Sequence, residues 1–152
     1  MQKILILFSL IIFSIPSYSI EDNFLSVQKE FKSGHYLDAL KELEKINSSE
    51  PQQIAMKDYW YGLCYSKLQQ FDKAAIAYKS ALKNKGQFED LYYELGQALY
   101  ATNDMEQARK SFALSAKKNN YKTETSYYYI GHISQILEEH KTAKEYYQRV
   151  LD

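Results

Sequence analysis

The side chains best suited to catalysis or metal binding are few in this chain and lie far apart in its sequence. The histidines are His35, His132 and His140, and the one cysteine is Cys64. No His-Glu-x-x-His or Cys-x-x-Cys spacing occurs, so the usual ligand spacing of a metal site is missing. We therefore expect no metal site, with His132 at a binding surface, His140 packed in a turn and Cys64 a small core residue.

Other catalytic arrangements are also missing from the sequence. The five glycines are isolated from one another, so no glycine-rich phosphate-binding loop is present. The paired carboxylates of Glu138 and Glu139 fall at a predicted helix end, where we expect water to solvate them. Lys and Arg total 19, as do Asp and Glu, so the basic excess typical of nucleic-acid binding is absent. We expect neither an enzyme nor a bound cofactor, and no nucleic-acid partner.

Three sets of residues recur with one spacing, which indicates the elements that would position any binding side chains. Gly62, Gly96 and Gly131 are 34 and then 35 residues apart. The alanines at 74, 108 and 143 keep the same two intervals. A third set begins one interval earlier, and its members are Leu43, Tyr78, Phe112 and Tyr147. A fixed period near 34 is typical of stacked supersecondary units.

These positions resemble those of the tetratricopeptide repeat family, which builds helix–turn–helix units of this length. The resemblance implies an all-α fold, an α-solenoid of about four such units. We place the units at about 20–53, 55–88, 89–123 and 124–152. Gly34 is expected in the first turn, Pro51 at the start of a helix, and Asp104 as an N-cap.

The first 19 residues have the pattern of a secretory signal peptide. Lys3 is followed by an apolar run at Ile4–Ile15, then by Pro16 and the small-x-small sequence Ser17-Tyr18-Ser19. A membrane-spanning helix needs roughly 20 apolar residues, and this run is shorter. We expect cleavage, a repeat domain over 20–152, no stable membrane span after cleavage, and export to the bacterial periplasm or cell envelope. Retention of the segment as an anchor stays open.

The first helix of each unit is expected to line the concave face of the stack, as it does in this family. The fifth residue of each unit is aromatic, and such a row suits an extended peptide. Alternatively these rings belong to the core, because an error of one residue in register would exchange the row that faces the groove with the adjacent row that faces the core. The predicted groove residues are Phe24, Tyr59, Tyr93 and Tyr128, then Gln28, Leu63, Gln97 and His132 four places further on, with Phe31 and Tyr100 in the floor.

One subclass of the family grips a C-terminal carboxylate with Lys, Asn and Arg in the groove. The matching places here hold Phe24, Gln28, Trp60, Asp90 and Glu94. Two of them are acidic and would repel a carboxylate. The clamp is therefore absent, and no ligand can be transferred from that subclass.

The function predicted from these features is a non-catalytic adaptor or scaffold of the bacterial envelope that binds a peptide segment of a partner protein. A structural protein that assembles with itself is the alternative. In that case Tyr146, Val150 and Leu151 of the last helix would join two copies, because the sequence ends at Asp152 inside the second helix of unit four. A homodimer is the simplest such assembly. The sequence leaves open the partner and the pathway.

Overall fold

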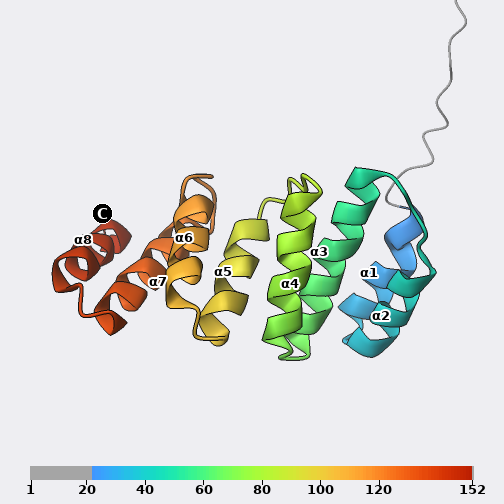
Figure 1. Cartoon of the computed structure of the whole chain (residues 1–152), viewed down its shortest axis with the longest axis horizontal. Coiled ribbons are helices and arrows are strands. Elements are labelled where there is room, and N and C mark those ends of the chain that lie inside the picture. The colour runs from blue at the N-terminus through green and yellow to red at the C-terminus, as the bar shows by residue number, and fades with distance from the viewer. Residues whose placement is uncertain (1–21, 152) are drawn as a thin grey trace, which may run out of the picture.

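The structure, a computed structural model, describes residues 22–151, and over this range the chain is all α-helical with no strand (Figure 1). The signal-peptide prediction falls on residues 1–19 and lies outside the described part. None of the described helices is both long and apolar enough to cross a membrane. The elements are a 3-10 turn at Asp22–Phe24, then α1 Leu25–Lys32, α2 Tyr36–Lys45, α3 Pro51–Lys67, α4 Phe71–Lys83, α5 Leu91–Ala101, α6 Met105–Ala116, α7 Thr123–Ile136 and α8 His140–Leu151.

The helices stand side by side in one row from α1 and α2 at one end to α8 at the other (Figure 1). Each helix packs mainly on the one before it and the one after it in the sequence. Short turns join the members of each pair, so α1–α2, α3–α4, α5–α6 and α7–α8 are antiparallel hairpins. The predicted solenoid of about four helix–turn–helix units is confirmed.

The turn inside each hairpin has the same backbone conformation in all four units. One residue per turn adopts a left-handed φ, and these residues keep the spacing of 35, 34 and 35. The amide of the next residue donates to the carbonyl oxygen five positions earlier, as His35 does to Glu30 at 2.9 Å, which closes the helix end. The left-handed residues are Gly34, Gln69, Asn103 and Glu138, with φ of 80°, 58°, 64° and 60°.

Each repeated glycine lies beneath an aromatic ring of the second helix in its own unit. A Cβ added to Gly62 would be 2.3 Å from Cε1 of Tyr78, and one added to Gly96 would be 2.9 Å from the Phe112 ring. In each of these units the ring comes sixteen residues after the glycine, and it belongs to the third repeated set. The glycine set and the ring set of Tyr78, Phe112 and Tyr147 are therefore two sides of one packing contact.

The buried side chains form two clusters along the stack. The smaller one holds Phe24, Val27, Ala39, Leu43 and Cys64 between units one and two, and the larger one runs through units two to four. Cys64 is fully buried, and burial raises the pKa of its thiol to about 11. The expected core role of Cys64 is confirmed. Pro51 opens α3 as predicted, and the Asp104 side chain accepts from the Gln107 amide at the start of α6.

Candidate functional site

First helices from all four units meet at one cavity, which we call the inner groove. Its volume is about 500 Å³. Its lining is mainly apolar, and its polar members are Ser66 and Lys67 of α3 with Glu94 and Gln97 of α5. We define the inner groove by Phe31 of α1, Leu63 of α3, Glu94, Gln97 and Tyr100 of α5, and Tyr129 of α7.

The structure brings together four of the predicted groove residues at this cavity, namely Phe31, Leu63, Gln97 and Tyr100. Two more adjoin it on α7. The Tyr100 hydroxyl lies 3.0 Å from Nδ1 of His132, and the ring of Tyr128 stacks on His132 with centroids 6.1 Å apart. Tyr128 is 49% exposed, so this aromatic extension of the groove is open to solvent.

Phe24 does not lie at the groove surface, and its predicted place there is wrong. It lies 35 residues before Tyr59, in the same row as Tyr59 and Tyr93, and directly precedes α1, which begins at Leu25. Phe24 is 1% exposed and packs in the smaller core cluster. Gln28 is half-buried on α1 and does not line the cavity.

Tyr59 and Tyr93 are largely withdrawn from the surface that they were expected to line. Tyr59 stacks on Phe88 with centroids 4.4 Å apart, and burial raises the pKa of its hydroxyl. Tyr93 is 6% exposed, and burial raises its pKa to about 12. Its hydroxyl accepts a 3.2 Å hydrogen bond from Nε2 of Gln97, so the buried ring orients a groove side chain.

The row of residues that lines the groove is shifted by one place from the predicted row. Glu94 and Tyr129 are the sixth residues of their units, beside the fifth residues Tyr93 and Tyr128. They lie one turn before Gln97 and His132, since residues three apart share a helix face. Of the predicted row four places further on, Leu63 and Gln97 line the cavity and His132 adjoins it. A spacing of three rather than four before Gln97 and His132 reaches Glu94 and Tyr129.

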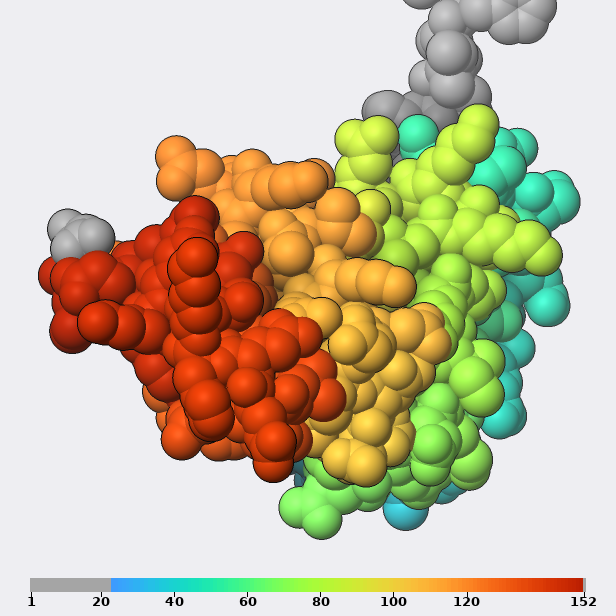
Figure 2. Space-filling view, turned by 60° about the vertical axis from the view of Figure 1, so that its left-hand side comes forward, coloured from blue at the N-terminus to red at the C-terminus, as the bar shows by residue number. Residues whose placement is uncertain are grey.

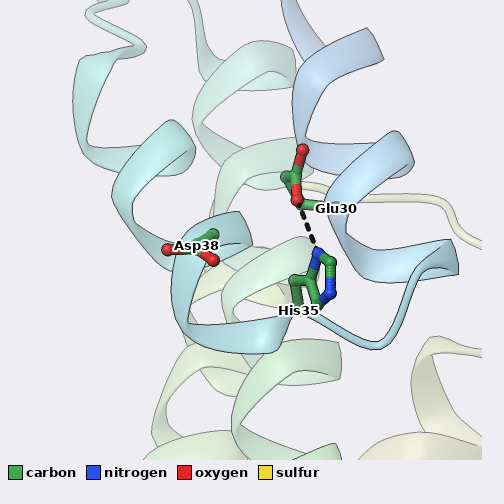
Figure 3. Close-up of side chains that lie close together, drawn as sticks. All are labelled: Glu30, His35 and Asp38. Atoms are coloured by element: carbon green, nitrogen blue, oxygen red, sulfur yellow. Dashed lines mark hydrogen bonds and ion pairs between the residues drawn. The ribbon is translucent and has the colours of Figure 1, made fainter.

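A cluster of possible metal ligands lies at the other end of the molecule, in the turn between α1 and α2 (Figure 3). Glu30 and His35 point toward each other, with Oε2 and Nδ1 3.1 Å apart, and Asp38 lies beside them. Asp38 is paired with Lys41 at 2.8 Å, and this hydrogen bond lowers the pKa of its carboxyl. Because the groups already pair with one another or with lysine, they are explained as contacts that fix the turn.

The three residues predicted for self-association lie on α8, at the end of the row (Figure 2). Tyr146 is half-buried beside Tyr127, with the Arg149 guanidinium 5.0 Å from its ring centroid. Val150 is half-buried and Leu151 is 80% exposed. Leu151 borders a shallow cavity of about 380 Å³ with Ala143 and Tyr147. Contact between two copies at this surface stays a prediction.

Comparison with known proteins gives a match to the tetratricopeptide repeat, which recurs three times, at residues 59–88, 89–117 and 124–152. Among solved structures, the fold is similar to the one titled "Crystal structure of MamA", with a TM-score of 0.76 and 18% sequence identity. The alignment covers 88% of this chain and 77% of that one. No curated protein matches the sequence.

Proposed function

The chain belongs to the tetratricopeptide repeat family, and from that premise we propose that it is a non-catalytic adaptor whose inner groove binds a peptide segment of a partner protein. The observation that carries this proposal is the convergence of α1, α3, α5 and α7 on one cavity. Ligand cavities of about 300–1,000 Å³ that combine apolar walls with a few polar groups are typical of binding sites. The inner groove has this size and this mixture of side chains.

The groove side chains suit a peptide because they offer apolar faces beside hydrogen-bonding groups. Phe31, Tyr100 and Tyr129 present rings to the cavity, and ring faces bury apolar side chains with little loss of conformational entropy. Gln97 can donate to a peptide carbonyl and accept from a peptide amide. Its position is fixed from below by the Tyr93 hydroxyl.

We further propose that this adaptor works in the envelope of a bacterium after export. The support for this location is the pattern of Lys3, the apolar run Ile4–Ile15 and the sequence Ser17-Tyr18-Ser19. An adaptor there would hold an exported or membrane-attached partner by a segment that extends from the partner's own fold.

Replacing Tyr100 with alanine is expected to weaken peptide binding by about 2 kcal/mol, a factor of roughly 30 in Kd, because it removes a central aromatic anchor. Random twelve-residue peptides displayed on phage would be selected on the purified protein, and their affinities measured by fluorescence anisotropy. Ile76→Ala is the control, since Ile76 is 69% exposed on α4 and outside the groove. Selected peptides that bind Tyr100→Ala as tightly as the parent protein would contradict the proposal.

Self-association through α8 is the second candidate function, and the exposure of Leu151 favours it. A second copy could cover Leu151 and the adjoining cavity across a two-fold axis. Substituting both Val150 and Leu151 with lysine is expected to convert a dimer into a monomer, because it places two charges in the contact. Light scattering at micromolar concentrations measures the mass, and a monomer before and after the substitution would remove this candidate.

A further inference from the structure

Glu94 brings a negative charge into the inner groove without a partner for it. Its side chain lines the cavity and is half-buried on α5. Within residues 22–151, the carboxylate accepts no side-chain hydrogen bond and forms no ion pair. Loss of hydration raises its pKa. A carboxylate that is partly desolvated and unpaired costs stability, so its presence needs a compensating interaction.

The nearest acidic neighbour adds to this cost. Asp90 lies four residues earlier on the same face of the helix, and like charges at this spacing repel each other. The Tyr121 hydroxyl donates to Oδ2 of Asp90, while Oδ1 is buried and has no hydrogen-bond partner in the described chain. Two carboxylates therefore lie at the start of α5, one of them in the cavity lining, and their combined field favours a cation beside Glu94.

Two lysines lie near Glu94, but neither approaches within ion-pair distance. Both lysines act to lower the pKa of the Glu94 carboxyl, but burial outweighs them and the pKa stays raised. The ammonium of Lys122 lies over the Tyr93 ring, 4.4 Å from the centroid, and 5.0 Å from that of Tyr121. Lys67 also lines the cavity, but its side chain is exposed, so water solvates its charge. The carboxylate is therefore left available to a ligand.

Aromatic rings around the same cavity complete a site for a cationic side chain. Tyr100 and Tyr129 pack edge to face with centroids 5.5 Å apart, and Phe31 borders the cavity from α1. Ring faces attract ammonium and guanidinium groups and also cover the apolar stem of a lysine or arginine. A carboxylate beside such rings would bind both parts of the side chain at once.

We propose that the inner groove selects a peptide segment carrying a basic residue, an arginine or lysine flanked by apolar residues, whose cationic group pairs with Glu94. This inference rests on the proposed function, because it names the class of peptide that the groove binds. It also agrees with the acidic residue Glu94 in the groove, at one of the places where a subclass of the family has polar and basic residues that grip a carboxylate. The charge preference of the ligand is thereby reversed.

The test uses the peptides selected on the purified protein by phage display, now compared for sequence and charge. We expect arginine or lysine between apolar residues in most of them. Glu94→Gln should weaken their binding about tenfold or more, because a desolvated charge pair loses one partner. Replacing the peptide arginine with citrulline, its neutral isostere, should weaken binding to the parent protein as much. The two changes together should cost little more than either alone.

Matched controls separate this inference from the proposed function and from misfolding. Glu124→Gln removes the same charge from an exposed position on the first turn of α7 and should leave Kd unchanged. Glu94→Gln should not lower the melting temperature, since the amide is neutral and keeps the shape of the side chain. If Tyr100→Ala weakens binding but Glu94→Gln does not, the inference is wrong while the proposed function stands. If no selected peptide depends on the groove, both are wrong.

Discussion

Replacing Phe112 with alanine is expected to lower the free energy of unfolding by about 3–5 kcal/mol, the range measured for aromatic-to-alanine changes in protein cores. Phe112 is fully buried on α6. Its ring stacks on Tyr129 with centroids 4.5 Å apart and contacts Tyr93 edge to face at 5.7 Å. The ring also covers Gly96, so one side chain joins α5, α6 and α7. Its removal leaves a cavity that three separate helices would have to shift to fill.

The cooperative unit that this substitution disturbs is larger than one repeat. In a stacked array each unit is stabilised by its neighbours, and Phe112 links unit three to unit four through Tyr129. Urea unfolding followed by circular dichroism measures the loss. Leu37→Ala is the comparison, since Leu37 is 61% exposed on α2 and its loss should cost no more than about 0.5 kcal/mol. Equal losses for the two variants would contradict the assignment of Phe112 to the core.

The repeat spacing was sufficient to predict the fold because each unit repeats the same contact. Gly62, Gly96 and Gly131 each pack against the aromatic ring of the residue sixteen positions later. A glycine, a ring and a left-handed turn residue at a constant interval indicate one hairpin copied along the chain. The left-handed turns at Gln69 and Glu138 were not predicted, because neither residue type favours that conformation. Their positions follow only from the repeat spacing, because Gly34 and Asn103, at the equivalent places, are residue types that tolerate a left-handed φ.

The groove was predicted less completely than the fold, for a reason that lies in helix geometry. Fifth and sixth positions of a unit are adjacent in sequence but about 100° apart around a helix, so the two side chains face different surroundings. Tyr93 and Glu94 show this division, with Tyr93 6% exposed and Glu94 lining the groove. The fifth place is aromatic in every unit, and this regularity led to its prediction as the groove row. The sixth place holds unlike residues and shows no pattern in the sequence.

Replacing Gly62 with alanine is expected to destabilise the protein by about 1–3 kcal/mol, although the same change in an ordinary helix stabilises by about 1 kcal/mol. The new Cβ would lie 2.3 Å from Cε1 of Tyr78 and 2.8 Å from its Cζ. Tyr78 is fully buried, and its hydroxyl lies 3.2 Å from Oγ of Ser66, so the ring has no room to move aside. Relief of the overlap therefore requires α3 and α4 to separate.

Gly131→Ala is the matched variant, because its Cβ would meet Tyr147 at 2.9 Å rather than 2.3 Å. Tyr147 is half-buried near the end of the stack, and its hydroxyl donates to Gln135 at an exposed position, so its ring can move. Thermal melts should show a clear loss for Gly62→Ala and a small change for Gly131→Ala. Adding Tyr78→Leu to Gly62→Ala should cost less than the sum of the two single changes, since the overlap is then gone. If the losses in stability of the two single variants simply added, Gly62 would not be needed to make room for the Tyr78 ring.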